Sequence, residues 1–148
     1  MSAIYEIISV GKLKNSSPFS AAYDEYQKRL QGHVSIIELE GKSQVDEHTK
    51  ILSKINPDAN IIALDERGKT VSSIEFTNKI EQFQTSKNGK TQIIIGGADG
   101  LSHDIRQTAD LVLSFGKQTW PHMMVRIMLL EQLYRAEKII AGHPYHRE

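Results

Sequence analysis

Short apolar runs alternate along the chain with longer stretches in which apolar residues recur at helical spacing. Runs rich in isoleucine and valine predict buried strands, and helical spacing predicts amphipathic helices. The expected strands cover residues 3–10, 33–39, 60–65, 91–97 and 110–115. The expected helices cover residues 18–30, 44–55, 72–86, 102–109 and 122–140. This alternation predicts an α/β domain with a mostly parallel sheet flanked by helices.

Local signals support several of these boundaries. Asn56-Pro57 is expected to end the second helix, because the residue before a proline disfavours helical backbone. Ser72 or Ser73 is expected to cap the third helix, since a serine oxygen accepts hydrogen bonds from the first free N–H groups. We expect residues 66–69 to form a turn after the third strand, with Asp65, Glu66 and Arg67 solvated.

The last expected helix is apolar nearly all round for its first two turns. A surface helix normally carries a single apolar stripe. Burial on two sides, against the sheet and against another subunit, is the simpler interpretation, and a central core helix in a monomer is the alternative. The residues that exceed a single stripe are Met123, Met124, Val125, Ile127, Met128, Leu129 and Leu130.

Composition narrows the class of protein. A chain of 148 residues is the usual size of one domain, so we expect residues 1–148 to form a single domain. The absence of cysteine excludes disulfides and thiolate metal sites. No stretch is apolar enough to span a bilayer and the N-terminus lacks a signal-peptide layout, so a cytoplasmic protein without a membrane contact is expected.

Lys plus Arg and Asp plus Glu both number 18, so the net charge is zero with histidine neutral. This balance argues against an indiscriminate nucleic-acid binder, whose affinity would come from phosphate neutralisation. From Lys117 to the end, however, five Lys and Arg stand against three Glu. If the protein contacts RNA, we expect the C-terminal third to do so.

Three of the expected strands end in loops suited to a small nucleotide-like ligand. These loops are Leu64–Gly68, Gly96–Gly100 and Phe115–Trp120. The carboxyl ends of parallel strands are the usual place for such ligands, and glycine lets the backbone approach without a side chain in the way. GGADG does not match the dinucleotide fingerprint GxGxxG. An ordinary strand-ending turn is the alternative for each loop taken alone.

The chain stops on HPYHRE (143–148), which contains two imidazoles, a phenol and a guanidinium. Folding alone rarely requires such a set, so we expect ionisable chemistry there, with a flexible polar terminus as the alternative. Zinc binding by His143 and His146 is a weak interpretation, because two histidines with one acidic neighbour and no thiol make a poor ligand set. We therefore expect no metal.

The segments IIGGADGLS (94–102), LSFGKQTWPHMMVRIMLLEQLYRA (113–136) and HPYHRE resemble the RlmH family of SPOUT methyltransferases, bacterial enzymes that methylate N3 of a pseudouridine in large-subunit ribosomal RNA. The resemblance covers essentially the whole chain. It implies a C-terminal trefoil knot, which general rules of chain connection would exclude. It also implies a homodimer that binds S-adenosylmethionine in the knot and acts on the ribosome. By the same resemblance, the cofactor pocket is lined by Leu64, Gly96, Phe115, Gly116, Lys117, Gln118, Thr119 and Trp120.

The reaction implied by the resemblance suggests roles for the terminal residues. Methyl transfer from a sulfonium is an in-line displacement, so the protein must align the nucleophile and manage one proton. A histidine that titrates near neutrality, His143 or His146, is the expected base for N3–H, while a water-mediated route or stabilisation of the N3 anion by arginine stays open. Tyr145 is expected to stack on or hydrogen-bond the base, and Arg147 and Arg126 to hold phosphates or a developing oxyanion.

Other polar residues have simpler interpretations. We expect Asp99 to support the glycine loop, and Trp120 either to line an adenine slot or to pack on the first turn of the last helix. His33, His48 and His103 are expected at the surface or as caps.

Three rival functions stay open. The first is a SPOUT methyltransferase for another RNA nucleoside, and the second is a non-catalytic nucleotide-binding or ribosome-associated module. A flavodoxin-like redox domain is the third, and the missing phosphate loop near the first strand disfavours it. Because the net charge is zero, we expect the assembled ribosome to be a better substrate than free RNA.

Overall fold

The computed structural model describes residues 4–147, and its centre is a five-stranded sheet whose strands all pair in parallel. The strand order is β2-β1-β4-β3-β5. The strands are β1 (Ile4–Val10), β2 (Val34–Leu39), β3 (Asn60–Thr70), β4 (Lys90–Ile95) and β5 (Leu111–Ser114). The expected α/β class is therefore confirmed. The trefoil knot stays a prediction.

Helices connect the strands. They are α1 (Ser20–Arg29), α2 (Gln44–Lys54), α3 (Ser73–Gln84), α4 (His103–Thr108) and α5 (His122–Ile140), with a short 3-10 turn η1 (Lys87–Gly89). Ser72 caps α3 through a capping box with Glu75, in which each side chain accepts from the other residue's N–H. The bounds of α5 agree with the expected range, while residue 3 of the first expected strand lies outside the described residues.

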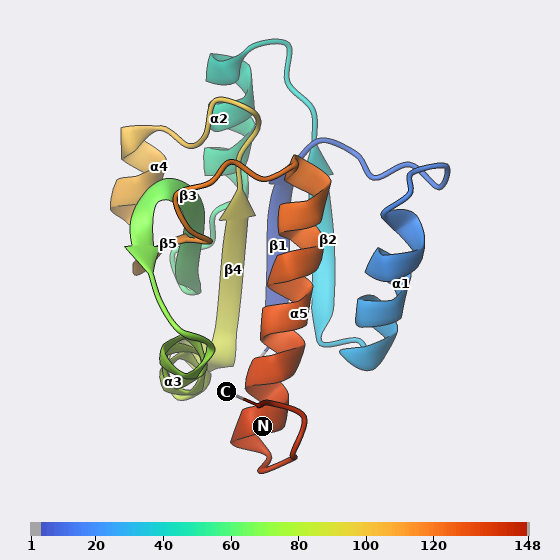
Figure 1. Ribbon diagram of the computed structural model, residues 1–148. Coiled ribbons are helices and arrows are strands. Elements are labelled where there is room, and N and C mark those ends of the chain that lie inside the picture. Colours follow the sequence, from blue (N-terminus) through green and yellow to red (C-terminus); the bar gives the residue numbers. More distant parts are fainter. Residues whose placement is uncertain (1–3, 148) are drawn as a thin grey trace.

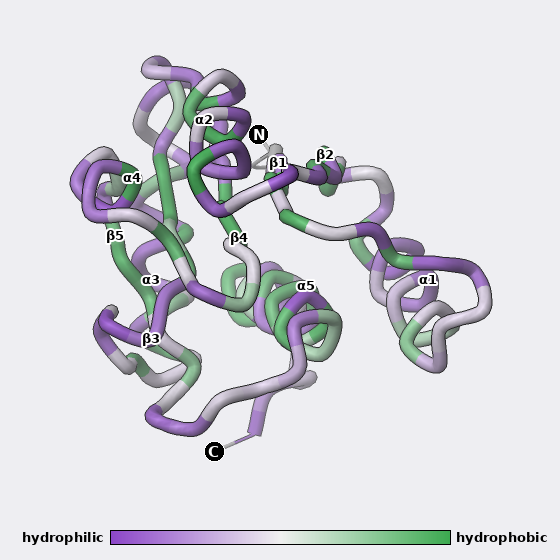
Figure 2. Tube along the Cα trace, turned by 90° about the horizontal axis from the view of Figure 1, so that it is seen from above, coloured by the Kyte–Doolittle hydropathy of each residue, from purple (hydrophilic) through white to green (hydrophobic). Residues whose placement is uncertain are grey.

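The helices cover both faces of the sheet (Figure 1). Viewed from above in Figure 2, α2 and α4 lie on one side of the strands, and α1, α3 and α5 lie on the other. Each side has its own apolar core, with Leu129 and Leu133 buried in one and Ile105 in the other. Neighbouring residues of a strand supply opposite cores, as Ile7 and Ile8 do.

The prediction of a turn at residues 66–69 is wrong. β3 continues through this segment and pairs with β5 on both sides of a register shift between Leu64 and Lys69. A Cβ at Gly68 would lie 2.6 Å from the backbone of Val112, so only glycine allows the two strands to approach this closely. Gly68, which looks like a turn glycine in the sequence, therefore allows β3 and β5 to pack closely.

α5 is buried on one side and partly exposed on the other. Leu129, Leu130 and Leu133 are fully buried against the sheet. Met124 and Ile127, which belong to the excess apolar residues of the first turns, are only half-buried. The expected contact with another subunit stays a prediction. Nowhere between residues 4 and 147 does a helix have the length and apolar character needed to cross a membrane.

A buried guanidinium links α5 to β1 and β2. The side chain of Arg126 is 1% exposed and donates to Glu38 Oε2 at 2.6 Å. It also donates to Ser9 Oγ at 2.9 Å and to Gly11 O at 3.3 Å. Burial by itself would raise the pKa of Glu38, but the hydrogen bonds from Arg126 and from Leu13 N–H outweigh burial and hold that pKa below its usual value.

We expect Glu38→Gln to lower the free energy of unfolding by about 2–4 kcal/mol at pH 7, because it leaves the buried Arg126 charge without a counter-ion. The pKa of Glu38 is lowered in the folded chain, so the stabilisation is complete above the unfolded-state pKa of about 4.3. It is lost as the pH falls through the lower folded-state pKa. Denaturant unfolding at pH 7 and at about pH 3 measures both effects.

The control for this prediction is Glu40→Gln, which removes an exposed carboxylate from the same end of β2. It should change the free energy of unfolding by less than about 0.5 kcal/mol. A difference between Glu38→Gln and the wild type that stays constant from neutral to acid pH would contradict the proposed ionic link.

Candidate functional site

The loops that follow β4 and β5 meet residues 64–67 of β3 at the carboxyl edge of the sheet and enclose a cavity of about 650 Å³. In Figure 1 they lie at the upper end of β4, beside the first turn of α5. Small-molecule sites span about 300–1,000 Å³, so the cavity is large enough for one ligand. Of the residues expected to bind a cofactor, those that line it are Leu64, Gly96, Phe115, Gly116, Gln118, Thr119 and Trp120. Lys117 is not among the lining residues.

The loop after β4 is closed by an antiparallel bridge between Gly97 and Gly100, whose N–H donates to Gly97 O at 3.1 Å. A Cβ at Gly96 would lie 2.9 Å from Gly100 O and 2.8 Å from the side chain of Leu101. Closure of the loop on itself therefore requires glycine at this position. His48 Nε2 lies 3.3 Å from Gly100 O, so this histidine contacts the loop from α2.

A buried carboxylate links β3 to the glycine loop. The side chain of Asp65 is 1% exposed and pairs with the Arg67 guanidinium at 2.9 Å. It also accepts from Leu101 N–H at 3.0 Å and from Arg67 N–H at 2.9 Å. Burial by itself would raise the pKa of Asp65, but these hydrogen bonds, led by the Arg67 side chain, hold it below its usual value. Asp65 is thus not part of a solvated turn, and it supports the glycine loop in place of Asp99, which is exposed.

The loop between β5 and α5 has its own internal order. Gly116 has a φ of +109°, in the left-handed region that favours glycine. Trp120 Nε1 donates to Phe115 O at 3.2 Å, so the indole closes the loop. The indole also lines the cavity, as expected if it forms part of a ligand slot. Thr119 Oγ1 donates to Glu66 Oε1 at 3.3 Å and thereby joins this loop to β3.

His122 lines the cavity as well, although no pattern in the sequence singled it out. Its Nε2 lies 3.3 Å from Ser9 Oγ. Burial lowers the pKa of His122 and the charge of Arg126 lowers it further, so the imidazole is neutral at pH 7. The signal that could have found it is its position as the first residue of a helix directly after a loop expected to bind a ligand.

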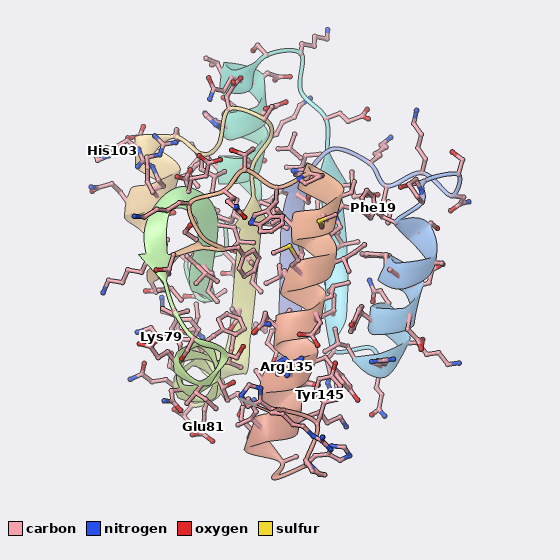
Figure 3. All side chains as sticks on the ribbon, viewed as in Figure 1. Phe19, Lys79, Glu81, His103, Arg135 and Tyr145 are labelled. Carbon is pink, nitrogen blue, oxygen red and sulfur yellow. The ribbon has the colours of Figure 1, made fainter. Side chains whose placement is uncertain are left out.

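The terminal segment 143–147 follows the far end of α5, a helix of 19 residues and therefore about 28 Å long. The segment folds back along the helix, and Figure 3 shows Arg135 and Tyr145 close together there. Tyr145 donates to Glu131 Oε2 at 2.6 Å, and Arg135 Nη1 lies 3.0 Å from His146 Nδ1. The hydrogen bond to Glu131 raises the pKa of Tyr145 to about 12. The tail is thus anchored, but it does not line the cavity of its own chain.

The other expected catalytic residues lie apart from the cavity. Arg126 is enclosed by its contacts with Glu38 and Ser9, so in this structure it positions α5 and does not reach a phosphate or an oxyanion. His143 and Arg147 are exposed on the tail. Among residues 4–147, no cluster of three His, Cys, Asp or Glu side chains is arranged to hold a metal ion.

Known proteins resemble the chain over nearly its whole length. Residues 4–146 match a family model described as "Predicted SPOUT methyltransferase". A protein of Rhodospirillum centenum named ribosomal RNA large subunit methyltransferase H is 39% identical over 148 residues, which cover 95% of this chain and 97% of that protein. A protein of the same name from Bradyrhizobium diazoefficiens is 41% identical over 155 residues, with coverages of 95% and 97%.

A solved structure, the SpoU methyltransferase AviRb from Streptomyces viridochromogenes in complex with AdoMet, aligns with a TM-score of 0.47 and 11% identity. The alignment covers 92% of this chain and 61% of that one. A likeness at this level carries no argument about the site.

We expect Asp65→Asn to loosen the glycine loop, because an amide nitrogen cannot accept hydrogen bonds and the ion pair with Arg67 is lost. The free energy of unfolding should fall by about 1–3 kcal/mol, and Leu101 N–H should exchange faster relative to a core amide such as that of Ile93. Denaturant unfolding and amide hydrogen exchange measure the two effects. Asp99→Asn, in the same loop but exposed, is the control and should behave like the wild type. Unchanged exchange at Leu101 in Asp65→Asn would show that the carboxylate does not hold the loop.

Proposed function

Because this chain belongs to the SPOUT methyltransferase family, we propose that it transfers a methyl group from S-adenosylmethionine to N3 of a pseudouridine in the large-subunit RNA of the assembled ribosome. The observation that carries the proposal is the cavity at the carboxyl edge of the sheet, which brings together the three segments expected to bind a cofactor, one of which belongs to strand β3. Relatives that are 39% and 41% identical are named for methylation of large-subunit ribosomal RNA, which supports this class of substrate. The particular nucleoside is part of the proposal.

The residues that line the cavity fit an adenosyl group. Leu64, Phe115 and Trp120 offer apolar surface for a purine ring. Backbone groups of Gly96–Gly100 can pair with the ring nitrogens or the ribose, since glycine leaves them accessible. The carboxylate of Glu66 suits a ligand that carries a cationic sulfur and an ammonium group. The bound group supplies an activated methyl on a sulfonium that leaves as a neutral thioether.

The chain itself must align N3 with that methyl, exclude water and provide an acceptor for the N3 proton. His143 and His146 are the candidates for the acceptor, and a water molecule held by the tail is the alternative. Tyr145 does not serve as this base at neutral pH, because its pKa is raised to about 12 and it stays protonated. Its role is to donate a hydrogen bond or to stack on the base.

We further propose that the active form is a homodimer that works in the cytoplasm. The apolar residues Met124 and Ile127 of α5 are only half-buried in one chain, and a second subunit would cover them. The tail anchored on α5 does not line the cavity of its own chain, which leaves room for the tail of either subunit to complete a site. The trefoil knot is part of the same proposal.

Methylation of intact ribosomes tests this function most directly. The protein and methyl-labelled S-adenosylmethionine are incubated with ribosomes that lack the modification, and the label is mapped by nuclease digestion and mass spectrometry. We expect label on N3 of one pseudouridine of the large subunit. Protein-free RNA should receive at least about tenfold less label, because a chain with zero net charge gains little from phosphate neutralisation.

Three outcomes of this experiment would change the proposal. Label on another nucleoside would keep the reaction and replace the substrate. No label, with the cofactor still bound, would favour a non-catalytic ribosome-associated role. Efficient methylation of protein-free RNA would show that the assembled ribosome is not required.

Removal of residues 145–148 should separate cofactor binding from turnover. Because the tail does not line the cavity, we expect the affinity for S-adenosylmethionine to change by less than about threefold, while methyl transfer falls by at least about 100-fold. Calorimetric titration and the ribosome assay measure the two. Tyr145→Phe keeps the edge-to-face contact with Tyr134, at 4.9 Å between ring centres, and isolates the contribution of the hydroxyl. A large loss of affinity on truncation would make the tail part of the cofactor site.

A further inference from the structure

A second cavity, of about 390 Å³, adjoins the candidate cofactor cavity. Residues 113–116 line both cavities. The second cavity lies between the start of α3, the end of β5 and the middle of α5, and its other apolar lining comes from Val71, Phe76 and Met128. The proposed cofactor site uses none of these three residues.

The polar groups of this cavity form a connected rim. Ser73 Oγ donates to Gln132 Oε1 at 2.8 Å, and Gln132 Nε2 donates to Glu131 Oε1 at 3.3 Å. Glu131 also accepts from Tyr145 at 2.6 Å and from Arg135 at 3.0 Å. The hydrogen bonds therefore run from α3 past the second cavity to the C-terminal tail, where Figure 3 shows Tyr145 beside the lower half of α5.

We propose that the second cavity receives the methyl-accepting base, which is a uracil-type ring turned out of the RNA. This inference rests on the proposed function. In-line transfer requires the acceptor nitrogen within about 3–3.5 Å of the methyl carbon, so the base must occupy space next to the cofactor. Residues 113–116 line both cavities, so the two cavities lie side by side at this segment. A cavity of about 390 Å³ has room for one nucleoside and not for a helix.

The chemistry of the lining matches a pyrimidine. Phe115, Val71 and Met128 offer apolar contacts to the two faces of a flat ring, as in other sites that hold a base outside its stack. Pseudouridine has two N–H groups, at N1 and N3. The amide oxygen of Gln132 has two lone pairs, of which Ser73 uses one. The other accepts N1–H, which leaves N3 free to face the cofactor cavity where the two linings meet at residues 113–116.

Ser73→Leu tests the proposal because it places a larger side chain in the second cavity and leaves the lining of the cofactor cavity unchanged. We expect the affinity for S-adenosylmethionine to stay within about threefold of the wild type. Methyl transfer to ribosomes should fall by about 100-fold or more, since the base cannot reach the reactive distance. Ser73→Ala removes the hydroxyl without filling the cavity and should keep transfer within about tenfold of the wild type.

Asn78→Leu, at an exposed position of α3, is the matched control for an added leucine and should transfer at the wild-type rate. Thermal unfolding of all variants identifies any that fail to fold. Unimpaired transfer by folded Ser73→Leu would overturn the proposal. An equal loss of cofactor affinity and transfer would overturn it too, because the second cavity would then belong to the cofactor site.

A second measurement does not depend on turnover. With the methionine methyl groups labelled with carbon-13, pseudouridine is titrated into the protein saturated with S-adenosylhomocysteine. We expect the NMR signal of Met128, which lines the second cavity, to shift, while that of Met123, which lies near Gly11, stays in place. A shift confined to Met123, or no shift at Met128 up to the solubility of the nucleoside, would overturn the proposal. If the wild type methylates no RNA, the proposed function fails, and this titration still tests the base site alone.

Discussion

The buried ion pair between Arg126 and Glu38 is the interaction on which the arrangement of both cavities depends. It fixes the rotation of α5 against β1 and β2. The guanidinium is 1% exposed, so breaking its hydrogen bonds would leave a buried charge without a partner, which costs much free energy. Successive turns of the same helix then present His122 to the first cavity, Met128 to the second, and Glu131 to the tail. A small rotation of α5 would move all three together.

Hydrogen bonds hold the segments that line the cavity at the sheet edge. Parallel strands bring their carboxyl ends to one edge, but they do not by themselves order the loops that follow. That order comes from hydrogen bonds within and between the loops, among them Trp120 to Phe115, Thr119 to Glu66 and Leu101 to Asp65. These hydrogen bonds join the two loops and β3 into the arrangement that lines the cavity.

Helices and strands with local signals in the sequence could be predicted. The predictions were wrong where the structure depends on a contact between residues that are distant in sequence. The helix at 122–140 was predictable because its apolar density and the preceding proline are local signals. Residues 66–69 resemble a turn, and only the approach of β5 to Gly68 shows that they form a strand. Asp65 resembles a solvated acid until Leu101, 36 positions away, donates to it. The resemblance gave the residues expected to line the cofactor pocket. Only the structure shows that the tail lies apart from the cavity.

The charges around the first cavity suit a cationic ligand and also determine where the proton chemistry can occur. His122 is kept neutral, because burial and the neighbouring Arg126 both lower its pKa, and a protonated ring there would repel a sulfonium. The negative charge of Asp65 is balanced by Arg67, while Glu66 adds a carboxylate to the lining. A histidine in this cavity that accepted the N3 proton would become a cation and would repel the sulfonium. The histidines that are candidates for the base, His143 and His146, lie on the tail and do not line this cavity, so their protonation would not place a second positive charge beside the sulfur.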